Sequence, residues 1–105
     1  MFFDKRPPKY VLIAGCRNFE DYSVAKKYID MCLKNIRKEY KIIIISGGAK
    51  GADKLGERYA HENRMKCIYY YPDWERYGKS AGPRRNSEMV KKADYVIFFW
   101  VGKIT

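Results

Sequence analysis

The segment with the residue types best suited to chemistry is a glycine-rich stretch, Ser46-Gly47-Gly48-Ala49-Lys50-Gly51-Ala52-Asp53. It follows a short apolar run and precedes a helix-like pattern, so free backbone N–H groups and the positive end of a helix dipole would meet at one point. Glycine permits positive φ and lets an anion approach the backbone closely. The stretch matches neither a dinucleotide fingerprint nor a Walker loop, because Lys50 precedes Gly51 and no Gly-Lys pair followed by Ser or Thr occurs in it. It predicts a phosphate site, with a purely structural tight turn as the alternative.

Two other segments combine glycine with arginine: Gly15-Cys16-Arg17-Asn18 and Gly82-Pro83-Arg84-Arg85-Asn86. In an open parallel sheet the carboxyl ends of the strands lie at one edge, and ligands bind where the strand order reverses. Arg17 and Arg85, or Arg84, would then converge with the glycine-rich stretch on one polyanionic group, because guanidinium forks bind phosphate oxygens bidentately. Taken singly, each arginine is more often a surface residue. The expected ligand-binding residues are Gly15, Arg17, Ser46, Gly47, Gly48, Lys50, Gly51, Asp53, Arg85 and Asn86.

The acidic residues near the glycines give no separate case for a reaction. Asp53 would hydrogen-bond a ribose hydroxyl, or it simply favours the helix start as a carboxylate in the first turn. We expect Glu57 to be solvated, with a role as acid or base as the alternative if the helix start faces the ligand. We expect His61 to be a helix-surface or packing residue and not a catalyst. The sequence contains no Ser-His-Asp order and no paired-carboxylate spacing. The residues therefore support binding better than catalysis, and they leave any catalytic residue unknown.

Metal and disulfide chemistry are not expected. Cys16, Cys32 and Cys67 are widely spaced and form no CxxC pair, and His61 is the one histidine available to complete a ligand set. We expect reduced thiols, no metal site and no cofactor beyond the nucleotide-type ligand itself.

Four short apolar runs predict the strands that position these residues: 10–14, 42–45, 67–71 and 95–100. They are nearly continuous and rich in β-branched or aromatic residues, which is typical of parallel strands buried on both faces, the three tyrosines 69–71 included. Apolar residues at helical spacing predict helices over 23–39, capped by Asp21 or Ser23, and over 52–63, where small residues allow close approach to the sheet. A third helix begins with Pro83 in its first position. The pattern predicts an α/β fold, a three-layer Rossmann-like domain with a parallel sheet of about four strands in the order 3-2-1-4.

The connection over 72–82 is long for a βα loop in so small a domain. Trp74, Tyr77 and Lys79 make it a candidate flap over a bound ligand. The alternative is a surface excursion in which the two aromatic rings pack on the core.

The composition bounds the class of protein. A chain of 105 residues forms one domain, 1–105. A net charge of +10 favours anionic partners such as nucleotides, nucleic acid or anionic lipid, although solvated helix surfaces account for much of the lysine. Because no apolar run reaches the roughly 20 residues of a membrane helix, and no cleavable leader is evident, we expect a cytoplasmic protein without a membrane partner.

The same motifs resemble those of a known family. Gly15-Cys16-Arg17 with Phe19, the stretch 46–53, Asp73-Trp74 and Gly82-Pro83-Arg84-Arg85-Asn86 together are similar to the small YspA-type proteins of the SLOG superfamily. The resemblance spans nearly the whole chain. It implies a Rossmann-like fold that binds nucleotides or nucleotide-derived ligands.

Two relatives within that superfamily imply different activities. The LOG enzymes cleave a nucleoside monophosphate between base and ribose, so an enzyme of this type would be a phosphoribohydrolase-like, nucleotide-directed hydrolase. The DNA-processing protein DprA binds single-stranded DNA, and its Ser-Gly-x-Ala-x-Gly-Ile-Asp pattern with a later Ala-His resembles 46–53 with Ala60-His61.

The chain departs from the family pattern in two places. Cys16 stands where Ser or Thr is usual, which weakens a hydroxyl contact to phosphate but keeps the backbone donors. The residues 101–105 stand where the family continues into a further helix, so we expect the domain to lack a C-terminal helix and the last wall of the pocket beyond Gly102.

Three functional hypotheses follow. The first is a protein that binds, and in one version processes, a small nucleotide-type ligand. The alternative is a single-stranded nucleic-acid-binding module resembling DprA, supported by the charge of +10 and the ten tyrosines. The second alternative is a protein-interaction adaptor that uses the sheet edge or Tyr69–Tyr71. The oligomeric state, including a homo-oligomer, stays open.

Overall fold

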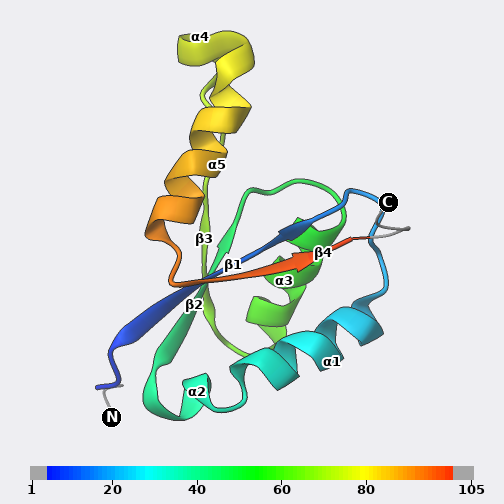
Figure 1. Cartoon of the computed structure of the whole chain (residues 1–105), viewed down its shortest axis with the longest axis vertical. Helices are drawn as coiled ribbons and strands as arrows, with labels where there is room; N and C mark the ends of the chain where they lie inside the picture. Colours follow the sequence, from blue (N-terminus) through cyan, green and yellow to red (C-terminus); the bar gives the residue numbers. More distant parts are fainter. Residues whose placement is uncertain (1–4, 101–105) are drawn as a thin grey trace.

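A parallel sheet of four strands forms the centre of the molecule (Figure 1). The computed structural model describes residues 5–100. The strand order is β3-β2-β1-β4, which confirms the expected 3-2-1-4 order and the Rossmann-like architecture. The strands are β1 (Pro8–Gly15), β2 (Lys41–Ser46), β3 (Lys66–Tyr69) and β4 (Tyr95–Phe99).

The larger core lies between one face of the sheet and the helices α1 (Tyr22–Leu33) and α3 (Ala52–Glu62). Ile13 of β1 and Ile44 of β2 pack here against Ile29 of α1 and Tyr59 of α3, all fully buried. As expected from its small residues, α3 lies close to the sheet. A Cβ atom added at Gly56 would lie 2.8 Å from the Cβ of Ile13, so a larger residue would push the helix away.

The single helix expected over 23–39 is wrong, because the structure divides it into two. The first part is α1, and a turn at Lys34 and Asn35 separates it from α2 (Ile36–Glu39). Asp21 caps α1, since its carboxylate accepts a hydrogen bond from the backbone N–H of Val24. Asparagine is unfavourable in helix interiors, which is consistent with a break at Asn35.

The opposite face of the sheet carries α5 (Ala81–Lys92), whose Met89 packs on Leu12 and Ile45. The expectation that Pro83 takes the first helical position is wrong, because the helix starts two residues earlier, at Ala81. Pro83 still lies within the first turn, where a backbone N–H has no partner inside the helix.

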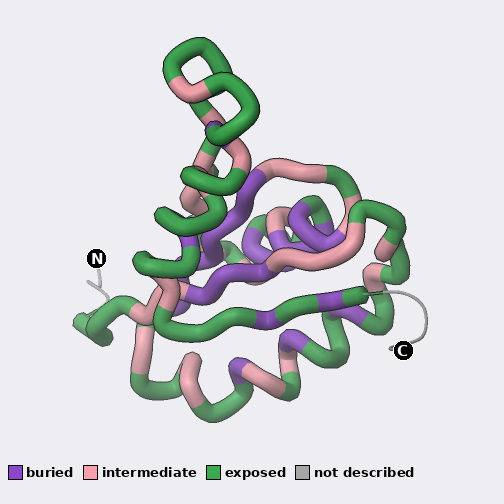
Figure 2. The backbone as a smooth tube through the Cα atoms, turned by 45° about the horizontal axis from the view of Figure 1, so that its top comes forward, coloured by how far each residue is buried: buried purple, intermediate pink, exposed green. Residues whose placement is uncertain are grey.

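The expectation that the strands are buried on both faces is wrong for β3 and β4. In β4 the side chains of Val96 and Phe98 are 53% and 59% exposed, and most of this strand is exposed in Figure 2. Tyr69 and Tyr71 are also exposed, and their rings stack with centroids 6.0 Å apart. Val96 and Phe98 lie on the face that carries α5, the one helix that packs on that face within residues 5–100. Tyr69 lies on the opposite face, on the side of Cys67, in a strand at the edge of the sheet.

The connection expected over 72–82 is helical rather than a loop. It consists of α4 (Trp74–Tyr77), the 3-10 turn η1 (Gly78–Ser80) and the start of α5. These elements form an arm that projects beyond the sheet, with α4 at its tip (Figure 1). Asp73 caps α4 by accepting from the N–H of Arg76 at 3.1 Å. Within residues 5–100, no helix has the length and apolarity needed to cross a membrane.

Candidate functional site

A cavity of about 350 Å³ opens at the carboxyl edge of the sheet, between the second half of β1, the strand β4 and the middle of α5. It lies where the strand order reverses, the position at which open α/β sheets bind ligands. Five of the expected ligand-binding residues line it, and they come from three separate segments: Gly15, Arg17, Asp53, Arg85 and Asn86.

The cavity also has an apolar part that sequence reasoning missed. Val96 and Phe98 extend from β4, and Met89 and Val90 face them from α5. The sequence carried no signal for this part, because the continuous apolar composition of β4 predicts burial on both faces, while the structure exposes Val96 and Phe98. The cavity therefore combines a charged side with an apolar side, as an amphiphilic ligand requires.

Asp53 is 6% exposed and lies at the start of α3. One of its carboxylate oxygens accepts a hydrogen bond of 3.2 Å from the N–H of Ala49. Burial raises the pKa of Asp53, and the nearby charge of Glu57 raises it further, while the N–H of Ala49 and the guanidinium of Arg85 act in the opposite direction. The glycine-rich stretch therefore already binds a carboxyl group, that of Asp53 in the helix that follows it.

Arg85 ties the glycine-rich stretch to α5 and to the end of β3. Its Nη1 atom donates to the carbonyl oxygens of Gly47 at 2.6 Å and Tyr70 at 3.2 Å, and its Nε atom donates to Asn86 at 2.8 Å. Part of the guanidinium is therefore used within the protein. The remaining part still lines the cavity.

Ser46 lies beneath the stretch and is completely buried. Its hydroxyl donates to a carboxylate oxygen of Glu57 at 2.7 Å and accepts from the N–H of Gly48 at 3.0 Å. The expectation of a solvated Glu57 is wrong, because this bond holds its carboxylate against the sheet and leaves the side chain 14% exposed. Sequence spacing alone does not reveal that Glu57, on α3, faces Ser46 at the end of β2.

One glycine of the stretch, Gly51, is required by backbone contacts within the protein, and a second, Gly47, is crowded by the ends of two side chains. Gly51 has φ +78°, and a Cβ atom there would lie 2.2 Å from the carbonyl oxygen of Cys16. A Cβ atom at Gly47 would lie 2.9 Å from Nη1 of Arg85 and 3.0 Å from Oδ2 of Asp53. The structural-turn alternative therefore explains Gly51 without a ligand, while the side-chain ends beside Gly47 can shift.

The remaining expected residues lie around the cavity rather than in its lining. Ser46 and Gly47 are buried, and Lys50 is exposed. Gly48 and Gly51 belong to the same stretch, which reaches the cavity through Ala49 and Asp53. The assignment of Ser46, Gly47, Gly48, Lys50 and Gly51 as ligand contacts stays a prediction.

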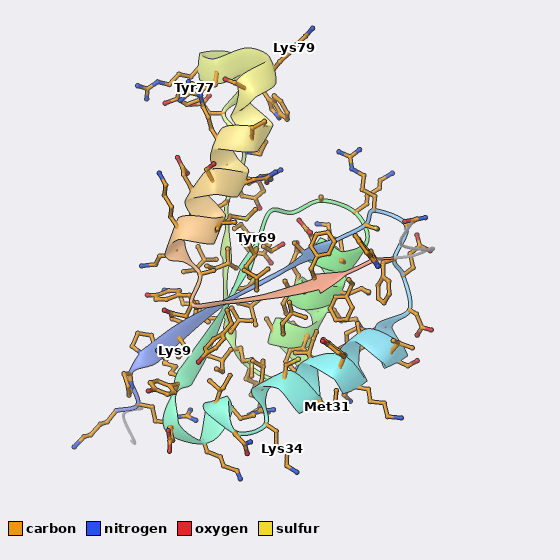
Figure 3. All side chains as sticks on the ribbon, in the orientation of Figure 1. Lys9, Met31, Lys34, Tyr69, Tyr77 and Lys79 are labelled. Atoms are coloured by element: carbon orange, nitrogen blue, oxygen red, sulfur yellow. The ribbon has the colours of Figure 1, made fainter. Side chains whose placement is uncertain are left out.

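The candidate flap residues lie on the arm. Tyr77 lines a neighbouring hollow of about 230 Å³ with Arg76, Arg84 and Arg85. Tyr77 and Lys79 lie near the tip of the arm, away from the sheet (Figure 3). Arg85 lines both hollows, so it links the arm to the cavity, and the flap stays a prediction.

Among the described residues, no group of three or more His, Cys, Asp or Glu side chains lies close enough together to hold a metal ion. Cys16, Cys32 and Cys67 are free thiols. The further wall expected beyond Gly102 concerns residues 101–105, which lie outside the described range.

Comparison with known proteins gives one family and one relative. The model of the family described as YspA, cpYpsA-related SLOG family matches residues 9–77, from β1 to the end of α4. The chain is similar to the Gene 61 protein of Mycobacterium phage D29, with 35% identity over 99 residues that cover 89% of this chain and 78% of that protein. No solved structure matches the chain significantly.

Proposed function

The chain belongs to the YspA, cpYpsA-related SLOG family, and from this premise we propose that it binds a nucleotide or a nucleotide-derived phosphorylated ligand. The site is the cavity at the carboxyl edge of the sheet. One observation carries the proposal: side chains from β1, α3, β4 and α5 meet there and give a cavity of about 350 Å³ that is charged on one side and apolar on the other. A nucleotide has the same division, with an anionic phosphate at one end and a flat base at the other.

The phosphate binds on the charged side. Arg17 is exposed at the cavity, and within residues 5–100 its guanidinium has no ion pair and no hydrogen bond, so both of its edges can reach phosphate oxygens. The amide of Asn86 and the free part of Arg85 lie on the same wall. The phosphate replaces no existing contact of Arg17, which lowers the cost of binding.

The base packs on Phe98 and Val96, and the ribose lies between the two ends, near Asp53. Covering Phe98 removes an exposed aromatic ring from water, which stabilises the complex by roughly 25 cal/mol for each Å² of apolar surface buried. Asp53 accepts a hydrogen bond from a ribose hydroxyl. The raised pKa of this carboxyl makes its protonated form, which can donate instead, more accessible than for an ordinary aspartate.

Titration calorimetry with the four common nucleoside 5′-monophosphates, ribose 5-phosphate and inorganic phosphate tests the proposal. We expect a monophosphate to bind more tightly than ribose 5-phosphate, because only the former covers Phe98. Arg17→Gln should weaken binding by about tenfold to hundredfold, the usual worth of a charge-assisted hydrogen bond. Phe98→Ser should weaken binding of the nucleotide but not of ribose 5-phosphate.

Two matched variants serve as controls. Lys27→Gln removes an exposed positive charge from α1, and Val24→Ser removes an exposed apolar side chain from the same helix. Neither lines the cavity, so both should bind as the unchanged protein does. Absence of binding across the whole panel would reject the proposal, as would equal losses in the site and control variants. Analysis of the same mixtures for released base tests the hydrolase version.

A further inference from the structure

The sheet edge opposite the cavity carries a concentration of positive charge that the proposed function does not use. A cavity of about 140 Å³ lies there, lined by nine residues. Five of the nine are cationic and none is acidic: Arg6, Arg37, Lys41, Arg64 and Lys66. Like charges held together repel one another, so such a cluster favours binding of an anion.

The topology explains how residues far apart in sequence gather at this edge. In a parallel sheet all strands begin at the same edge, and β2 and β3 each begin with a lysine. Lys41 pairs with Pro8, and Lys66 pairs with Ile43, only two residues along from Lys41. Because neighbouring strands lie about 4.8 Å apart and side chains alternate between faces, Lys41 and Lys66 extend on the same face as near neighbours.

Four of these cationic side chains form no ion pair with another residue of the range 5–100. The ion pairs among residues 5–100 are Lys54–Glu57 and Arg58–Glu62, both on α3. Arg37, Lys41, Arg64 and Lys66 belong to neither pair. Glu39 lies on the same short helix as Arg37 but does not line the cavity.

The positive surface extends beyond this one cavity. A second hollow shares Arg37 and Asn63 with it and continues along α1, where Lys26 and Lys34 line it. Its one acidic residue, Asp30, already accepts a hydrogen bond of 2.6 Å from the hydroxyl of Tyr59. Lys9 and Lys34 lie toward the same end of the molecule in Figure 3. We call this surface the basic track: Lys26, Lys34, Arg37, Lys41, Arg64 and Lys66.

We propose that the basic track binds the phosphate backbone of a single-stranded nucleic acid. The track is extended, so it fits a chain of phosphates better than one compact anion. Tyr40 lines the first hollow and Met31 the second, which supplies flat or apolar surfaces for bases beside the cations. This site is distinct from the carboxyl-edge cavity and does not depend on nucleotide binding there.

The test measures binding of a fluorescent single-stranded oligonucleotide of about 15 nucleotides, a length within the usual site range, by anisotropy over a range of salt concentrations. The variant Lys41→Gln/Arg64→Asn/Lys66→Gln removes three charges from the track. Asn replaces Arg64 because φ is +55° there, a conformation that asparagine tolerates. We expect about tenfold weaker binding at low salt and a salt slope less negative by about 2, since each phosphate contact contributes about 0.7 for single strands.

The matched control, Lys27→Gln/Lys91→Gln/Arg76→Gln, removes two lysines and one arginine from exposed positions outside the track. It should keep most of the affinity and the slope. Equal losses in both triple variants would show that net charge alone binds the strand and would overturn the proposal. A loss of oligonucleotide binding in Arg17→Gln would overturn it too, because the strand would then lie at the carboxyl edge.

A measurement on the unchanged protein makes the test independent of how the variants fold. Lysine acylation with and without the oligonucleotide should show protection of Lys41 and Lys66 but not of Lys27 and Lys54. Uniform protection, or none, contradicts the proposal. Binding to a duplex or to phosphatidylserine vesicles as tight as to the single strand would likewise overturn it, because any polyanion would then serve.

Discussion

The Nη1 atom of Arg85 donates a hydrogen bond of 2.6 Å to the carbonyl oxygen of Gly47, which lies 38 residues earlier in the chain. The same atom reaches the carbonyl oxygen of Tyr70 at 3.2 Å. One guanidinium therefore connects the loop after β2, the end of β3 and the first turns of α5. It positions the wall of the cavity before any ligand binds.

Arg85→Gln should lower the free energy of unfolding by about 2 kcal/mol, the usual worth of hydrogen bonds to a charged group. The amide cannot reach both carbonyl oxygens, so at least one is left unpaired in a partly buried place. Urea denaturation measures the loss. Arg84→Gln is the control, because Arg84 is exposed on the same helix and contacts the Tyr77 ring at 4.2 Å. Equal losses of stability in the two variants would show that the hydrogen bonds of Arg85 to the two carbonyl oxygens do not stabilise the fold.

Gly51 and Gly78 form a natural pair for separating backbone strain from crowding. Their conformations are similar, with φ/ψ of 78°/−129° and 55°/−131°. A Cβ atom at Gly51 would lie 2.2 Å from the carbonyl oxygen of Cys16, whereas at Gly78 it would meet nothing within 4 Å. Both alanine variants carry a strain of about 1–3 kcal/mol.

Gly51→Ala should therefore lose clearly more stability than Gly78→Ala, and it should also weaken nucleotide binding, because α3 must shift away from Cys16. Thermal unfolding of both variants gives the comparison. If Gly78→Ala proves as damaging as Gly51→Ala, the close approach between Gly51 and Cys16 contributes nothing measurable.

The order of the first three strands was predictable because its causes are local. The strands β1, β2 and β3 are short runs of β-branched and aromatic residues, and the helical patterns between them favour crossovers to an adjacent parallel strand. The connection from β3 to β4 passes two strands, so the position of β4 beside β1 followed from the arrangement typical of Rossmann-like sheets and not from a local pattern. The spacing of apolar residues such as Ile29 and Tyr59 predicts the buried faces of their helices. These features need no knowledge of contacts distant in sequence.

Features that depend on distant contacts were not predictable. Phe98 has the composition of a buried strand residue, yet its exposure depends on what covers that face of the sheet. The need for glycine at position 51 arises from Cys16, which belongs to another strand end. Lys41 and Lys66 each resemble an ordinary solvated lysine, and only the strand order brings them together.

Parts of the arm could have been recognised more fully. Asp73 stands directly before the four residues of α4 and accepts from the N–H of Arg76, which is the usual arrangement of a helix N-cap. The length of the connection suggested a flap instead. How α4 folds back on the start of α5 involves the packing of Trp74 near Gly82, and no local pattern encodes that contact.

The stability of the protein should depend on pH through Asp53. Burial raises the pKa of this carboxyl in the folded state, so the folded protein holds the proton more tightly than the unfolded chain does. Stability therefore falls as pH rises from about 4, the unfolded value, through the higher folded value. Asp53→Asn removes this titration, so its stability relative to the unchanged protein should increase with pH across that window.

Urea denaturation at a series of pH values measures the difference between the two proteins. Asp21 and Glu62, whose carboxyl pKa values are lowered by hydrogen bonds from Ser23 and Tyr22, act with the opposite sign but are common to both proteins and cancel. A constant difference for Asp53→Asn would mean that its carboxyl titrates alike in the folded and unfolded chains.

Ser46→Ala should lower the free energy of unfolding by about 1–3 kcal/mol, because it leaves two partly buried polar groups without their partner. These groups are the carboxylate of Glu57 and the N–H of Gly48. Ser80→Ala is the matched control, since the hydroxyl of Ser80 also makes two hydrogen bonds, to the carbonyl oxygen of Tyr77 and from Arg84, but in solvent. Water replaces those bonds, so the loss there should stay within about 0.5 kcal/mol.

Glu57→Gln separates the hydrogen bond from the charge. The amide oxygen of glutamine still accepts from Ser46, so this variant should lose much less stability than Ser46→Ala. Because the charge of Glu57 raises the pKa of Asp53, its removal should also shift the pH-dependent loss of stability to lower pH. If Glu57→Gln is as unstable as Ser46→Ala and leaves the pH profile unchanged, the carboxylate acts neither as the acceptor for Ser46 nor on Asp53. The two anionic side chains beside the cavity would then be independent of each other.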